Sequence, residues 1–530
     1  MMRVGTPPVI GATTVLRRER DGGWLIVPVL VYAMLIATYF VVRLGGRTTE
    51  IDTAWLTLSI RSVALSGDLT PDTGFVYGNG YAYTAISNAI LAFTGLSIAT
   101  LQQLVYPATS ALLVFPAWAL YRELTGSVRV AALATLLLFM QPEFLFVVMR
   151  GSHERVLRAL MLVMLWLLVR SFRFREQPGH FAVHVALFYL TAYALIATNA
   201  LFGVSFAMAV ATAMALAFVL GRWRSSLIHL ASGTASRLLL VLFAVTALGF
   251  TFVYYIYPLS GQGLLAVGNL GQQVLALLLT LEGGTNPYAQ VVTAWTSLPV
   301  YLLLSSGDFL LILLAGGIWI GQGIRWLRGE NPATLSVWLL WLFCGAFAFQ
   351  GALSIVTDRA GLLGGNLQHR SFPSFALVAM PLVATALVDW GRRRWARLMI
   401  VAGLAVLAVT GVLKATNEPA LSNKWTFYAP SELQALAWAD RYVDHGAVWV
   451  GFDERLSTAY TIGLGREARD DQWDIYDPKP ATRAFLITNV VRLQGQRLGK
   501  PLPTVGGENQ LYDSGLAELY RLRPRTPYQR

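Results

Sequence analysis

Long apolar runs recur throughout the 530-residue chain, and they constrain its fold more than any other feature. About eleven of them are long enough to cross the roughly 30 Å of hydrocarbon in a bilayer. They lie near residues 24–43, 98–120, 127–148, 155–172, 181–198, 200–220, 237–257, 300–322, 334–356, 371–389 and 396–414. Because backbone groups in hydrocarbon must be satisfied internally, these runs predict helices. The sequence therefore predicts a polytopic α-helical membrane protein.

The overall composition agrees with membrane insertion. Hydrophobic residues make up 55% of the chain and charged residues only 13%, and the mean hydropathy is +0.54. A net charge of +12 would suit a nucleic-acid partner, but in polytopic proteins such an excess reflects Lys and Arg on cytoplasmic loops. The single cysteine, Cys344, excludes a disulfide framework and a cysteine-based zinc site. We therefore expect membrane lipids, and no nucleic acid, as partners.

Arginine marks alternate gaps between the apolar runs. These gaps carry Arg122, Arg129, Arg170, Arg173, Arg175, Arg222, Arg224, Arg237, Arg325, Arg328, Arg392, Arg393, Arg394 and Arg397. The other gaps are poorer in positive charge for their length, as the positive-inside rule requires of outer loops. The pattern predicts a cytoplasmic N-terminus, with the first apolar run kept as a signal anchor. It places the loops 44–97 and 258–299 and everything after Lys414 outside.

Two outer loops carry apolar segments of their own. Residues 80–95 are too few for a span, and counting them as one would invert the arginine pattern, so they predict a helix at the outer surface. The loop 258–299 has an apolar centre, which fits either a lid over a site or a plain surface helix.

The composition changes near residue 416. Residues 1–415 form the predicted membrane module, and 416–530 a small extracytoplasmic α/β domain. In the second part we expect a helix over 432–443 capped by Ser431, strands at 447–451 and 484–491, and a hairpin over 510–520.

Asp52 is the candidate catalytic base. It opens a short helix, which Thr49 would cap, on the outer side of the first span, and Glu50 lies beside it. Apolar residues recur at helical spacing along this helix (Ile51, Trp55, Leu58 and Leu65), so one face can lie against membrane or protein. Asp52 also fits a purely structural capping role. The two roles are compatible, because capping would fix the direction of the carboxylate.

Glu154 opens the fourth span and follows His153. The pair could bind an acceptor or, together with Asp52, a divalent cation such as Mg, Mn, Ca or Zn. One His and two carboxylates are no diagnostic metal signature, and capping by Ser152 explains an acid at this position equally well.

Further charged residues flank or enter the later spans. Arg359 and Arg370 bracket the outer loop before the tenth span, where a forked cation suits a lipid phosphate, or alternatively anchors the chain at the interface. Asp308 falls about eight residues into the eighth span, roughly 12 Å deep, and Glu143 lies in the third. Such buried acids line a hydrated cavity or bond to a neighbouring helix.

The order of short motifs resembles the GT-C fold glycosyltransferases, membrane enzymes that use polyprenyl-linked sugars. The run from Asp52 to Ser66-Gly67-Asp68 is similar to their first outer loop, and Thr94-Gly95, the basic turn 121–126 and Glu154 follow in the same order. The pair Thr198-Asn199 stands where many relatives have Thr-His-His. The tail resembles the outer domain of oligosaccharyltransferases, although residues 451–454 lack the WWDYG motif.

The resemblance implies transfer of a sugar from a polyprenyl phosphate to an acceptor hydroxyl of a lipid, glycan or protein, outside a prokaryotic plasma membrane. Asp52 would be the base, Arg370 and Arg359 would bind the donor phosphate, and Glu154, Glu50 and His153 would bind the acceptor or a cation. Two alternatives remain: an oligosaccharyltransferase or glycan ligase with a pyrophosphate-linked donor, and a non-catalytic lipid transporter or scaffold of the same fold.

Overall fold

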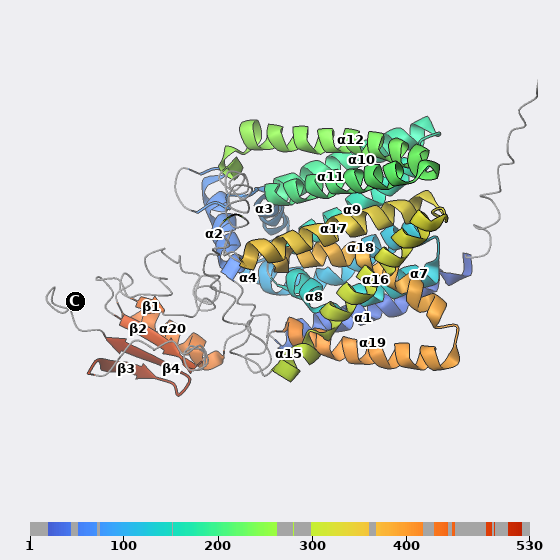
Figure 1. Ribbon diagram of the computed structural model, residues 1–530. Helices are drawn as coiled ribbons and strands as arrows, with labels where there is room; N and C mark the ends of the chain where they lie inside the picture. Colours follow the sequence, from blue (N-terminus) through green and yellow to red (C-terminus); the bar gives the residue numbers. More distant parts are fainter. Residues whose placement is uncertain are drawn as a thin grey trace, which may run out of the picture.

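The computed structural model of the chain describes residues 20–43, 51–71, 75–150, 152–261, 279, 298–359, 367–416, 429–443, 448–450, 484–489, 492 and 507–521. Most of these residues belong to long helices that run side by side (Figure 1). In chain order the helices are α1 Ile26–Arg43, α2 Ile51–Ser66, α3 Ala82–Thr94, α4 Ile98–Thr100, α5 Tyr106–Thr109, α6 Val114–Thr125, α7 Val128–Leu138, α8 Pro142–Met149, α9 Glu154–Arg173, α10 Pro178–Thr198, α11 Ala200–Trp223, α12 Ile228–Thr251, α15 Leu298–Leu304, α16 Ser306–Arg328, α17 Leu335–Arg359, α18 Leu367–Trp390, α19 Arg394–Ala415 and α20 Pro430–Tyr442.

The helices confirm the polytopic membrane fold. In the described part of the chain, nine helical segments are long and apolar enough to cross a membrane, and the bent pair of α7 and α8 makes a tenth. Helix α9 is richer in charge, but it has 20 residues and packs against α6 and α10 inside the same bundle. With α9 the bundle contains the eleven segments that the sequence predicts. The apolar segment 80–95 contains the shorter helix α3.

The third span has the ends that the sequence predicts, but it is not one straight helix, because α7 and α8 meet at 72°. Pro142 has no N–H to donate and forces Gln141 into an extended conformation (φ −81°, ψ 120°), which ends the helix there. The seventh span begins at Ser225 and not at residue 237, and Arg237 packs over the Phe172 ring at 5.1 Å.

The two ends of the bundle differ in composition. The turns between α6 and α7, α9 and α10, α11 and α12, α16 and α17, and α18 and α19 all lie at one end, which we call the arginine-rich end (Figure 1). Helices α2 and α3 and the turn before α9 lie at the other, which we call the α3 end. The loops that the sequence assigns to opposite sides of the membrane are thus segregated.

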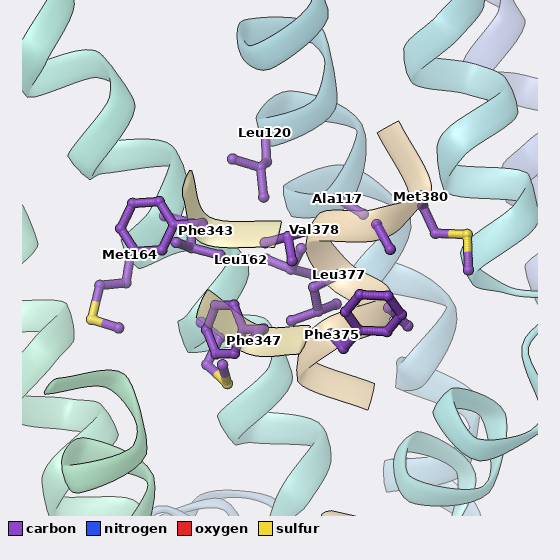
Figure 2. Packing of buried hydrophobic residues seen from close by; sticks show 14 of the residues in the cluster. Ala117, Leu120, Leu162, Met164, Phe343, Phe347, Phe375, Leu377, Val378 and Met380 are labelled. Carbon is purple, nitrogen blue, oxygen red and sulfur yellow. The ribbon is translucent and has the colours of Figure 1, made fainter. Parts of the chain in front are cut away.

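The middle of the bundle is a continuous apolar core. Figure 2 shows side chains of this core from several helices, among them Leu120 of α6, Leu162 of α9, Phe343 and Phe347 of α17 and Phe375 of α18. All five side chains are buried. This packing fixes α9 and α18 relative to each other, and both helices begin at the α3 end.

The described C-terminal residues form a small α/β unit. Strands β1 Val448–Val450, β2 Ala484–Thr488, β3 Asn509–Asp513 and β4 Ala517–Arg521 make a sheet of order β1-β2-β4-β3. Strands β1 and β2 are parallel and the other pairs antiparallel. Leu436 of α20 packs on Leu486 and Leu519. The predicted helix, strands and hairpin are present; the division of the chain near residue 416 stays a prediction.

The predicted cap of α20 is wrong. The helix starts at Pro430 after Ala429, so Ser431 lies inside its first turn. The carboxylate of Glu432 accepts a hydrogen bond from the Ala429 N–H at 2.7 Å, which satisfies a donor at the start of the helix.

Candidate active site

Helix α2, which carries Asp52, packs closely into the α3 end of the bundle. Leu56 and Ile60 are fully buried and share a cluster with Tyr83 of α3, and Val156 in the first turn of α9 packs against the same cluster. Asp52 lies one turn before Leu56 in the helix. The backbone position of Asp52 is therefore tied to the beginning of α9.

The predicted apolar face of α2 is only partly used for packing. Leu58 is buried, whereas Leu65 is 79% exposed near the end of the helix. Thr57 and Ser59 are also buried: the Thr57 hydroxyl donates to the Thr53 carbonyl at 2.7 Å, and the Ser59 hydroxyl bonds Thr84 of α3 at 3.0 Å. Polar contacts thus hold α2 on α3 along with apolar ones.

His153 lies in a polar network just before α9. Its Nε2 lies 3.2 Å from the Tyr77 hydroxyl and 3.0 Å from the Asn199 amide nitrogen, which also donates to that hydroxyl at 3.0 Å. The Tyr257 hydroxyl donates to the Tyr77 carbonyl at 2.9 Å. Burial raises the pKa of Tyr257 to about 12, so this hydroxyl keeps its proton at neutral pH.

Asn199 sets the protonation pattern of this network. Its side-chain oxygen accepts from the Leu201 N–H at 3.0 Å and caps α11, which fixes the orientation of the amide. The amide nitrogen is therefore the group that faces His153. Since an amide nitrogen only donates, Nε2 of His153 is an acceptor.

Glu154 is surrounded by arginine. Its side chain is 1% exposed; Oε1 lies 2.9 Å from Nη2 of Arg150, and Oε2 lies 3.8 Å from Nη2 of Arg158. The charge of Arg370 also acts on this carboxylate. The predicted cap is present as well, because the Ser152 hydroxyl accepts from the Glu154 N–H at 3.3 Å.

The start of α18 brings Arg370 to this cluster. Nη2 of Arg158 donates to the Arg370 carbonyl at 2.9 Å. The Leu367 N–H donates to Oδ1 of Asp358 at 2.7 Å, which satisfies one amide of the first turn of α18. The structure thus brings together His153, Glu154 and Arg370. Glu50, Thr49, most of the loop 258–299 and the side chains of Asp52 and Arg359 lie outside the described residues.

The described residues do not fit a divalent cation. Among them, no three His, Cys, Asp or Glu side chains lie close enough together to hold a metal ion. The Glu154 oxygens face two guanidinium groups, and Nε2 of His153 already accepts hydrogen bonds. A cation site that includes Asp52 therefore stays a prediction, and we derive no step through a metal.

Comparison with solved structures identifies the fold, whereas no protein-family model and no curated protein sequence matches the chain. The oligosaccharyltransferase of Archaeoglobus fulgidus in its apo form superposes with a TM-score of 0.58 at 12% identity, over 88% of this chain and 70% of that one. A complex of the archaeal enzyme with an inhibitory peptide and a dolichol-phosphate gives 0.53 at 11%, over 96% and 75%. A complex with Zn and sulfate gives 0.51 at 15%, over 78% and 56%.

The chain has the GT-C fold. At these identities the similarity is one of fold, and it confirms the predicted architecture of the membrane bundle.

Sequence reasoning did not predict three polar residues of this candidate site: Tyr77, Asn199 and Arg158. Arg158 had a usable signal, because an arginine one turn inside a membrane-crossing helix is costly unless it has a partner. Asn199 had a weak signal, because the resemblance already singles out the pair Thr198-Asn199. Tyr77 had none, since its importance depends on which distant loops meet at His153.

A second polar cluster of the GT-C bundle explains the buried acids. Lys414 of α19 pairs with Asp308 of α16, and its Nζ lies 3.3 Å from Oε1 of Glu143 of α8. The predicted depth of Asp308 is wrong, because the helix breaks at Ser305 and Asp308 lies in the first turn of α16. The interhelical contact, one of the two predicted explanations, is present.

Proposed function

We propose that this chain is a glycosyltransferase that moves a sugar from a polyprenyl-phosphate donor to an acceptor hydroxyl, outside a prokaryotic plasma membrane. The observation that carries the proposal is the convergence on the first turn of α9. The helix of Asp52 packs beside Val156, and the backbone of Arg370 bonds to Arg158. A candidate base and a candidate phosphate ligand, far apart in sequence, are tied to the same turn.

In this mechanism Asp52 accepts the proton of the acceptor hydroxyl as its oxygen attacks the anomeric carbon. The bond from that carbon to the phosphate oxygen breaks, and the lipid phosphate leaves with the bonding electron pair. Arg370, with Arg359, stabilises the charge that develops on the phosphate. A direct displacement inverts the configuration at the sugar carbon.

Glu154 has a specific part in the proposal. Because its carboxylate faces Arg150 and Arg158, it keeps these guanidinium groups oriented in a buried site. Direct contacts of Glu154, Glu50 or His153 with the acceptor belong to the same proposal.

A second candidate is an oligosaccharyltransferase or ligase that takes a preassembled glycan from a pyrophosphate-linked lipid. The similarity of fold to the Archaeoglobus fulgidus oligosaccharyltransferase supports this candidate. The third candidate, a transporter or scaffold without catalysis, shares the fold but needs no base.

One experiment separates the three. Cells lacking the protein are complemented with wild type, Asp52→Asn or Asp68→Asn, and their envelope glycans are compared by mass spectrometry. Asp68 is a matched control: it is exposed at the other end of α2, where its carboxylate accepts from the Thr70 N–H at 3.0 Å. We expect loss of one sugar with D52N and full rescue with D68N.

The other outcomes contradict the proposal in distinct ways. Loss of a whole glycan block that is restored only with a pyrophosphate-linked donor in vitro supports the second candidate. Full rescue by D52N shows that Asp52 is not the base and supports the scaffold.

A further inference from the structure

We infer that Arg158 is a positioning residue for the donor phosphate site: it holds the first turns of α18, and with them Arg370, in place against Glu154. The inference rests on the proposed function. Arg158 is entirely buried, and its guanidinium contacts residues of three helices.

The contacts of Arg158 with α18 are specific. Nη2 donates to the Arg370 carbonyl at 2.9 Å, and Nη1 donates to the Ser374 hydroxyl at 2.5 Å. The two bonds span one turn of α18 and use both terminal nitrogens of the planar fork. A lysine offers a single charged nitrogen and cannot reproduce this geometry.

The other contacts orient the guanidinium itself. Its central carbon lies 4.9 Å from the centre of the Phe202 ring in α11, and Nη2 lies 3.8 Å from Oε2 of Glu154 one turn earlier in α9. The cation–π contact and the ion pair lower the cost of burying the charge. They also leave the guanidinium little freedom to turn away from α18.

The start of α18 needs support of this kind. Pro373 lies inside the helix and has no N–H, so the carbonyl of the residue four positions earlier loses its helical donor. The first turn, which carries Arg370, is therefore weakly held by the helix itself. Arg158 bonds on both sides of Pro373, to the Arg370 carbonyl and the Ser374 hydroxyl, and so ties the weakened turn to α9.

The consequence is a division of roles between two arginines. Arg370 would touch the donor phosphate, whereas Arg158 would act only through Arg370. A displacement of about 1 Å at a binding group is enough to weaken its action by up to a hundredfold. Loss of Arg158 should therefore weaken phosphate binding without removing any group that contacts the phosphate.

The test uses the full-length protein in nanodiscs and measures binding of undecaprenyl phosphate, a polyprenyl phosphate without sugar. We expect Arg158→Met to raise the Kd about tenfold or more and Ser374→Ala to raise it about threefold. Arg158→Lys, which keeps the positive charge, should fall between wild type and R158M. In transfer assays the same variants should raise KM for the donor more than they lower kcat.

Arg170→Met is the matched control. Arg170 belongs to the same helix but lies at the arginine-rich end, where it pairs with Glu123 at 3.4 Å. Its removal should leave the Kd unchanged. If R158M fails to fold, R158K and S374A still decide the matter, since R158K keeps a cation at the site and S374A removes only one hydroxyl.

The outcomes separate the inference from the proposed function. If Arg370→Met abolishes binding while R158M, R158K and S374A all bind as wild type does, the positioning role is overturned and the proposed function stands. If wild type does not bind undecaprenyl phosphate, the proposed donor fails and this inference falls with it.

Discussion

Lys414 and Glu143 lie 3.3 Å apart, from Nζ to Oε1, and join the last turn of α19 to the first turn of α8. The same ammonium group pairs with Asp308 at the start of α16. One cation thus links two acids from two other helices, each largely excluded from solvent. The broken span formed by α7 and α8 is held to the bundle at this point.

Replacement of Lys414 by Met should destabilise the protein by about 3–5 kcal/mol, because two buried acids lose the cation between them. The thermal unfolding midpoint in detergent checks this. Arg392→Met is the control: its ion pair with Asp389 is exposed on both sides, and its loss should change little. An unchanged midpoint for K414M would contradict the prediction.

Gly80→Ala should disturb the docking of the loop before α3. A Cβ at this position would lie 2.5 Å from the Ala197 carbonyl oxygen and 2.7 Å from the Thr198 carbonyl carbon, and backbone atoms cannot yield as a flexible side chain does. We expect a loss of about 1–3 kcal/mol together with reduced transfer. Gly78→Ala meets nothing within 4 Å and should behave as wild type. Equal stability of the two variants would refute the close approach.

Tyr77→Phe should loosen the network around His153. The change removes a hydroxyl that lies 3.2 Å from Nε2 of His153 and accepts from Asn199. Leaving buried partners unsatisfied costs about 1–3 kcal/mol. Urea or thermal unfolding measures the loss, and Tyr254→Phe, at a 65% exposed tyrosine, is the control. If Y77F and Y254F unfolded at the same midpoint, the network would not contribute to stability and the prediction would be wrong.

Trp341→Phe should weaken the contact between α16 and α17 near the arginine-rich end. The rings of Trp319 and Trp341 stack at 4.5 Å, and each indole N–H donates to the other residue's carbonyl at 2.8 Å. Loss of one hydrogen bond and part of the stacked ring should cost about 1–2 kcal/mol in a thermal melt. Trp223→Phe changes a tryptophan that is 72% exposed and should cost much less. Equal melting temperatures for W341F and W223F would contradict this prediction.

The number and course of the membrane helices could be predicted because hydropathy is a local property. A long apolar run in a bilayer satisfies its backbone hydrogen-bonding groups by forming a helix. The arginines between the runs divide the turns into two sets. The break at Gln141 could not be predicted as surely. Proline is tolerated inside membrane helices, as Pro373 and Pro381 in α18 show, and which proline ends a helix depends on packing around it.

The site was predictable only in part, for the same reason. Glu154 and Arg370 stand at predicted helix starts, so their place at one end of the bundle followed from the span count. That Arg158 bonds Arg370 did not follow, because 212 positions separate the two residues and nothing local in the sequence relates them. Likewise, the pairing of Lys414 with Glu143 and Asp308 depends on three helices that meet only in the assembled bundle.

The charges of α9 have a consequence for how the protein is made. The polar partners of Arg158 on α18 emerge from the ribosome about 200 residues after Arg158 itself, a delay of some ten seconds or more at ordinary rates of synthesis. Until then its charge is offset by groups nearer in sequence, namely Glu154, one turn earlier in the same helix, and Phe202 of α11. The hydrogen bonds that join Arg158 to Arg370 and Ser374 can therefore form only after α18 has been synthesised.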